Sequence, residues 1–319
     1  DYSKFYRRER PVERLRADDV YSTEFISAFN TEFGLTPDEV VDGLAELLDL
    51  AVECDSVVVE TTLGTLRERL TVKRGLTPEA CQAFLSTFGL FHRPVWDTPP
   101  TGFKEKDIYP WRFRRRLSAT VRPLLVYGEK DDCTVLFGAG ALQLGFGYLL
   151  ERAAHGQLPD TFFDSQEMRS YWGAAKNERG HAFEETVADL FRKEGWQARK
   201  VWMTELGASP NLGDIDVLAR KLTGEVLIIE CKRLLFARTV AEIAEVCRRF
   251  RGEAADDLAK HVKRVAWVRE NSSSLDRIVG FRPDRDRIDD RLVTNTHVPM
   301  MYLNSLPIKA DKIGPLRQG

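Results

Sequence analysis

The sequence lacks long hydrophobic runs and has few cysteines, and each of these absences excludes a class of protein. No apolar run approaches the roughly 18 residues that a membrane-spanning helix needs. The five cysteines are scattered and form no C-x-x-C pair, which argues against a disulfide framework and against a zinc site. No glycine-rich P-loop is present, so a P-loop ATPase is excluded. We therefore expect a cytoplasmic protein with reduced thiols and no membrane partner.

The chain also lacks an excess of either charge. Its 319 residues include 47 Lys+Arg and 49 Asp+Glu, for a formal net charge of −2, which excludes a wholly basic nucleic-acid coat but not a local basic face. With 43% hydrophobic and 30% charged residues, the composition is that of a folded protein, and the length favours two domains. The first residues are polar and basic, unlike a signal peptide, and begin with Asp1 instead of Met. We expect a fragment whose parent protein carries an N-terminal extension.

The first half of the chain, residues 1–170, predicts a mainly helical α+β domain. Residues 23–54 show helical periodicity in two segments, and the second starts at Thr36-Pro37, with threonine as N-cap and proline in the first turn. Thr77-Pro78 starts another helix in the same way. Three short strands and one further helix complete the domain, over 56–60, 119–127, 133–137 and 140–154. We expect this half to bind DNA, a partner or itself, and to regulate the other half.

A more orderly pattern fills the second half, residues 171–319. The order of expected elements is helix, three strands, two helices and a strand: 178–195, 197–204, 214–220, 225–232, 239–251, 253–270 and 291–297. Such an order is typical of an α/β domain with a small mixed sheet flanked by helices. We place the domain boundary in the aromatic, irregular stretch over 156–176.

Charged residues occur where this pattern predicts buried strands. Residues 226–229 are continuously apolar, as in a central strand, yet Glu230 and Lys232 follow at once and share one face of the strand. Asp214 and Asp216 share a face of the preceding strand in the same way. Buried charges normally need an oppositely charged partner or a metal ion. These four side chains are therefore candidates for a functional site, although Asp214 can equally be a turn residue or a carboxylate behind the metal ligands.

The helix over 178–195 brings one carboxylate toward the same sheet. At about 100° per residue, Glu184 falls on the edge of the apolar stripe that faces the core, whereas Glu185 points toward solvent. Glu184 is therefore the residue of this pair that belongs with the strand carboxylates. The alternative for Glu184 is an ion pair with a nearby Lys or Arg.

Clustered carboxylates indicate metal-assisted chemistry. Carboxylate oxygens are hard ligands that suit Mg²⁺ or Mn²⁺ rather than zinc. An ion held by Asp216, Glu230 and the backbone carbonyl of Cys231 can stabilise charge on a phosphate and lower the pKa of a bound water. Lys232 can polarise that water or contact the scissile phosphate. The pattern thus favours phosphodiester hydrolysis.

These residues resemble the PD-(D/E)xK nuclease superfamily over about residues 178–300. Glu184, Asp216 and Glu230-Cys231-Lys232 occur in the order of its helix acid, hairpin Asp and (D/E)-x-K motif. The G-x-x-F-E and G-D-I-D forms look most like the restriction-endonuclease (Mrr-like) and resolvase-like branches. One departure is that Ile215, and not proline, precedes Asp216.

The resemblance implies a fold and a set of roles. The second half would be a restriction-endonuclease-like α/β fold with a mixed central sheet, preceded by the mainly helical α+β domain. Asp216, Glu230 and Lys232 would be the catalytic set, with Glu184 as an added metal ligand and catalytic residue. Asp214 is the alternative occupant of the Asp position and so a further candidate ligand.

Two basic groups are candidates for binding DNA. Arg112, Arg114, Arg115 and Arg116 are interleaved with Trp111 and Phe113, and flanking aromatic rings can stack on bases. The alternative is that this cluster anchors the two domains to each other. Arg248 and Lys263 lie on the two helices after the E-x-K strand, where they contact phosphates or form a solvated face paired with acidic residues.

Together these observations predict a Mg²⁺- or Mn²⁺-dependent DNA endonuclease acting in restriction or in defence against foreign DNA, the defence role resting on analogy of fold. A homodimer is expected, since many such nucleases cut two strands as dimers, and a further partner is possible. The alternatives are a non-catalytic DNA-binding or assembly module on a nuclease fold, and a nuclease acting on branched DNA or on RNA.

Overall fold

The computed structural model describes residues 20–110, 115–128, 133–234, 240–253, 256–298, 306–309 and 312–315. The contacts within the chain divide it into two compact units, residues 1–176 and 177–319. This boundary lies slightly beyond the one expected after residue 170.

Helix α8 (Gln166–Lys193) begins earlier than the sequence suggested. The second half of the aromatic stretch, residues 166–176, is helical and not an irregular connection, because its large side chains fall at helical spacing. Met168 is fully buried in the core of the first unit, and Tyr171 and Trp172 pack against the same core. Tyr171 and Trp172 also donate hydrogen bonds to the carbonyls of Ala154 and Leu158.

Helices build most of the first unit. They are α3 (Thr23–Phe33), α4 (Pro37–Glu53), α5 (Leu63–Arg74), α6 (Pro78–Phe88) and α7 (Ala139–Ala154). The starts predicted at Thr36-Pro37 and Thr77-Pro78 are confirmed, and both threonine hydroxyls accept the expected backbone hydrogen bond. Helix α5 was not predicted, because only three leucines mark its buried side among charged residues.

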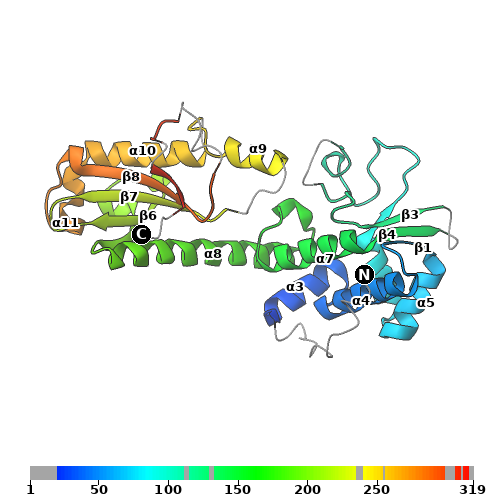
Figure 1. Cartoon of the computed structure of the whole chain (residues 1–319). Coiled ribbons are helices and arrows are strands. Elements are labelled where there is room, and N and C mark those ends of the chain that lie inside the picture. The colour runs from blue at the N-terminus through cyan, green and yellow to red at the C-terminus, as the bar shows by residue number, and fades with distance from the viewer. Residues whose placement is uncertain are drawn as a thin grey trace. The chain divides into compact units, whose positions relative to one another are not determined.

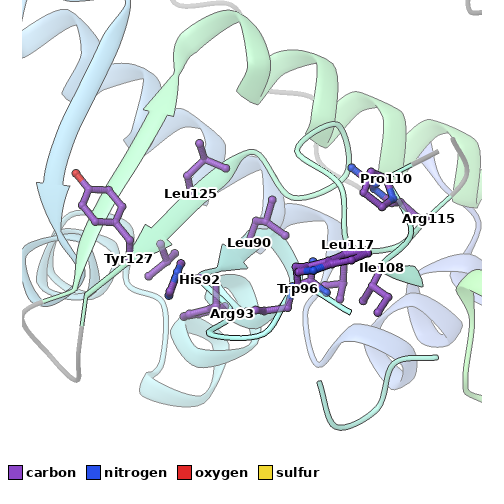
Figure 2. A pocket seen from close by; sticks show the side chains of 12 residues that line it. Leu90, His92, Arg93, Trp96, Ile108, Pro110, Arg115, Leu117, Leu125 and Tyr127 are labelled. Carbon is purple, nitrogen blue, oxygen red and sulfur yellow. The ribbon is translucent and has the colours of Figure 1, made fainter. Parts of the chain in front are cut away.

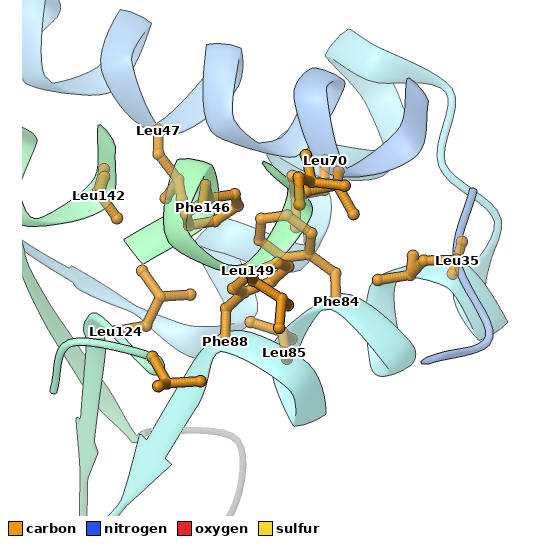
Figure 3. Close-up of a cluster of buried hydrophobic side chains, with 14 of the residues drawn as sticks. Leu35, Leu47, Leu70, Phe84, Leu85, Phe88, Leu124, Leu142, Phe146 and Leu149 are labelled. Carbon is orange, nitrogen blue, oxygen red and sulfur yellow. The ribbon is translucent and has the colours of Figure 1, made fainter. Parts of the chain in front are cut away.

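A four-stranded sheet in the order β1-β4-β3-β2 completes this unit. Strands β1 (Val58–Thr62), β4 (Thr134–Gly138) and β3 (Leu124–Tyr127) are antiparallel neighbours, and β2 (Gly89–Phe91) runs parallel to β3. The core between sheet and helices is rich in phenylalanine (Figure 3). Phe88 and Phe146 stack with centroids 3.9 Å apart, and Phe84 packs against both.

The second unit contains a mixed sheet in the order β5-β6-β7-β8-β9. Its first three strands are β5 (Gln197–Trp202), β6 (Asp214–Arg220) and β7 (Val226–Lys232), and each is antiparallel to the next. The other two strands are β8 (Ile288–Thr294), which runs parallel to β7, and β9 (Ile313–Pro315), which runs parallel to β8. Its other helices are α9 (Val240–Arg248), α10 (Asp257–Glu270) and α11 (Asp276–Val279). The expected mixed sheet flanked by helices is confirmed.

Helices α8 and α10 cover opposite faces of this second sheet (Figure 1). Val187 and Phe191 of α8 share an apolar cluster with Ile229 of β7. Val265 and Val268 of α10 share another cluster with the other face of the strands. Because β7 is apolar on both sides, it is the central strand, as its continuous run of hydrophobic residues predicted.

Short 3₁₀ turns connect these elements: Glu105–Asp107, Asp160–Phe162, Met203–Leu206, Pro210–Leu212, Ser272–Leu275 and Arg285–Arg287. Within the described segments, every helix is either too short or too polar to traverse a lipid bilayer.

Candidate functional site

The candidate site lies where two neighbouring strands of the second sheet separate. Pairing between β6 and β7 runs from Arg220↔Val226 to Val217↔Ile229 and stops there. Beyond this point β6 pairs with β5 alone, down to Asp214, while β7 stays paired with β8 up to Lys232. Asp216 and Glu230 are the first residues past the end of the ladder. The sequence therefore places two carboxylates at the opening of a fork between strands.

The side chain of Asp216 occupies this fork. Its Oδ2 accepts a hydrogen bond from the backbone N–H of Cys231 at 2.7 Å, so the carboxylate replaces a main-chain acceptor. Asp216 is only 7% exposed. Burial, followed by the nearby charge of Glu230, raises the pKa of Asp216 to about 7. Among the described residues, no Lys or Arg forms an ion pair with it.

Glu230, in contrast, is held between two cations. It is 3% exposed, and its Oε1 lies 2.6 Å from Nζ of Lys232, while Nη1 of Arg264 donates to its Oε2. Burial alone would raise the pKa of Glu230, but the positive charges of Lys232 and Arg264 outweigh it and lower the pKa. Burial likewise opposes the charge of Lys232, and Glu230 and Asp216 together raise its pKa. Glu230 and Lys232 are thus both charged at neutral pH.

Helix α10 contributes two residues to the site that sequence analysis did not assign to it. Arg264 is buried and also donates from Nε to the carbonyl of Leu212 at 2.9 Å. His261 is fully buried with Nδ1 3.8 Å from Oε2 of Glu230, and neither ring nitrogen bonds to a described residue. Burial lowers the pKa of His261 to about 4, so the ring is neutral. The sequence contains a sign of this role, because positions 261 and 264 are polar residues on the otherwise apolar face of α10.

Glu184 and Asp214 are paired with a lysine. Nζ of Lys200 on β5 lies 2.9 Å from Oε2 of Glu184 and 2.7 Å from Oδ2 of Asp214. Burial opposes the charge of Lys200, but the two carboxylates raise its pKa. The helix geometry is as expected, since Glu184 is mostly buried while Glu185 is exposed and bonded to Arg192. The ion-pair alternative weighed for Glu184 is therefore the arrangement observed.

The carboxylates of the candidate site can be compared with the ligands that a metal ion needs. Within the described residues, no three His, Cys, Asp or Glu side chains gather closely enough to form a metal centre. Mg²⁺, however, commonly uses one or two protein carboxylates and keeps several waters. Asp216 is a buried carboxyl beside a second carboxylate that raises its pKa, and a divalent cation would relieve that repulsion. Asp216 and Glu230 therefore fit a hard divalent ion, with Glu230 also bonded to Lys232 and Arg264, whereas Glu184 and Asp214 share the single charge of Lys200.

The arginines of the first unit that were predicted to contact DNA lie in different surroundings. Arg112 and Arg114 lie outside the described residues. Arg116 is buried and paired with Asp107 and Asp164, which is a structural position and not the exposed one that a phosphate contact requires. Arg115 lines a pocket of the first unit.

The two basic candidates in the second unit, Arg248 at the end of α9 and Lys263 on α10, are both exposed. An exposed cation is accessible to a phosphate group, so both remain candidates for DNA contact.

Comparison with curated proteins and with solved structures finds no match to this chain. The sequence profile of one family, described as Anti-phage protein Upx-like, matches residues 2–315. This match covers both units and includes the fork between β6 and β7. The chain therefore belongs to the Upx-like family of anti-phage proteins.

Proposed function

We propose that this chain is a metal-dependent endonuclease that hydrolyses phosphodiester bonds of DNA in defence against phage. The observation that carries the proposal is the fork at Asp216 and Glu230, with Lys232 held 2.6 Å from Glu230. A core strand gains no packing from a buried Glu and Lys, whereas hydrolysis of a phosphodiester uses both. Membership of a family described as anti-phage supports the defence role.

The proposed roles follow from the contacts. Asp216 and Glu230, with the Cys231 carbonyl, would hold Mg²⁺ or Mn²⁺, and the bound ion supplies charge stabilisation and a more acidic water. Lys232 keeps its proton and can donate a hydrogen bond to the attacking water or to a phosphate oxygen. Arg264 fixes the orientation of Glu230 from α10.

Cleavage of a supercoiled plasmid with Mg²⁺ or Mn²⁺ tests the proposal directly. Wild-type protein should nick or linearise the plasmid, and EDTA should abolish this activity. Lys232→Ala should lose at least 100-fold in rate, whereas Lys193→Ala, which removes an exposed lysine of α8 in the same unit, should cut normally. Equal thermal unfolding of the two variants ensures that a loss reflects chemistry. Cleavage by Lys232→Ala at the wild-type rate would overturn the assignment.

One observation favours a second candidate, a non-catalytic DNA-binding or assembly module. Glu230 already has two cationic partners, so the cluster could act as a buried ion-pair network that fixes the sheet. Phage challenge of cells distinguishes the two functions. If Lys232→Ala still protects cells from phage, the module is correct, and loss of protection with retained DNA binding supports the nuclease. Branched DNA and RNA belong in the same cleavage assay as alternative substrates.

A further inference from the structure

A pocket in the first unit has no role in the proposed cleavage site. Its volume is about 360 Å³, and it lies against strands β2 and β3. Figure 2 shows that its walls come from these strands, through Leu90, Leu125 and Tyr127, and from the segments that carry Arg93 and Arg115. Pockets of roughly 300–1,000 Å³ are typical of sites for small ligands.

Two arginines of this pocket each have a buried hydrogen-bond donor with no acceptor in the described part of the chain. Nη1 of Arg93 and Nη1 of Arg115 are both inaccessible to solvent and bond to no described residue. Neighbouring arginines, in contrast, have acceptors: Arg116 pairs with Asp107, and Arg122 donates to the carbonyl of Gly89. Among the described residues that line the pocket, none is acidic. With two guanidinium groups and no acidic side chain among its described lining residues, the pocket carries positive charge and is suited to an anion.

Aromatic rings surround the same pocket. Trp96 is 60% exposed, Phe91 44% and Tyr127 43%, and the ring of His92 lies among them. Exposed aromatic rings are costly in water, and bases stack on them readily. Guanidinium groups bind phosphates with two parallel hydrogen bonds. Together the rings and the two arginines match the two halves of a nucleotide, a flat base and a phosphate.

We propose that this pocket binds one phosphorylated nucleotide, with the phosphate on Arg93 and Arg115 and the base against Trp96. The volume accommodates a single nucleotide and not a duplex. Such a unit occurs in two forms, as a free mononucleotide or as the phosphorylated end of a DNA strand. The site is separate in sequence from Asp216 and Glu230, and the proposal stands whether or not the chain cleaves DNA.

Calorimetric titration of the whole chain in EDTA tests this binding without any cleavage. The ligands are AMP, adenosine, inorganic phosphate, an acidic peptide, and a short DNA strand with and without a 5′-phosphate. AMP or the phosphorylated strand should bind at least tenfold more tightly than adenosine, phosphate, the peptide or the unphosphorylated strand. Equal binding of AMP and phosphorylated strand identifies a free nucleotide, and tenfold tighter binding of the strand identifies a DNA end.

Substitutions in the pocket distinguish binding of the phosphate from binding of the base. Arg93→Met and Arg115→Met should each weaken binding at least tenfold, because each removes a charged hydrogen-bond donor. Trp96→Ala should weaken binding without affecting folding, since the side chain is mostly exposed. Arg67→Met is the matched control, a half-buried arginine on α5 outside the pocket, and should bind normally. Absence of binding, binding independent of the phosphate, or equal loss in Arg67→Met would overturn the proposal.

Discussion

Replacing Asp216 by Asn should stabilise the protein at neutral and alkaline pH. The folded structure raises the pKa of Asp216 to about 7, against 3.8 for an unperturbed Asp. Between these two values the folded state keeps a proton that the unfolded state has released. The contribution of Asp216 to the stability of the wild type therefore falls as the pH rises from about 4 to about 7, and is constant above that. Asparagine carries no charge at any pH, and its amide oxygen can still accept the Cys231 N–H.

The magnitude follows from the two pKa values. Their difference of about three pH units corresponds to about 4 kcal/mol of lost stability in the wild type above pH 7. Part of this loss is already present at pH 5. The stability of Asp216→Asn relative to the wild type should therefore increase by roughly 3 kcal/mol between pH 5 and pH 8.

Urea unfolding in EDTA at pH 5, 6, 7 and 8 measures this difference. Asp286→Asn, at an exposed aspartate of the same unit, is the control and should show no such trend. At pH 8, added Mg²⁺ should stabilise the wild type but not Asp216→Asn, since only the carboxylate attracts the ion. A difference between Asp216→Asn and wild type that stays constant with pH would refute the account of a buried, repelled carboxyl.

Two further predictions concern the first unit, and urea unfolding at neutral pH measures both. Gly43→Ala should cost at least about 2 kcal/mol, because its Cβ would lie 2.1 Å from the buried ring of Phe84. Gly147→Ala, on helix α7 with open space around it, is the control and should gain about 0.5–1 kcal/mol. Glu46→Ala should cost about 3 kcal/mol, because it removes the buried carboxylate that Arg69 and Arg74 share and leaves them only their exposed partners, Glu53 and Asp49. Unchanged stability in Glu46→Ala would mean that these exposed partners and solvent compensate both arginines.

Local signals in the sequence were sufficient for much of the fold. The Thr36-Pro37 start of α4 depends on a side chain bonding to its own turn, and strand β6 has the bounds expected from its apolar pattern. The orientation of Glu184 and Glu185 followed from helix periodicity alone. Such features need only information within a few residues, which a single sequence contains.

Features that depend on distant partners were not predictable. Strand β9 has three residues and is defined by pairing with β8, to which its own sequence gives no clue. Arg264 reaches Glu230 across 34 positions, so its role depends on how α10 packs on the sheet. The early start of α8 was hidden because aromatic residues can belong to a loop or to a helix face. Tertiary packing decided each case.

The hydrogen bond from the Cys231 N–H to Asp216 can form only when strands β6 and β7 are correctly aligned. A shift of β6 against β7 by one residue would turn every side chain of β6 to the opposite face. The carboxylate of Asp216 would then leave the fork, and the Cys231 N–H would lose its acceptor. Misaligned chains would therefore lack both the last hydrogen bond of the sheet and the carboxylate pair. Correct pairing of β6 with β7 and the approach of the two carboxylates therefore depend on the same alignment.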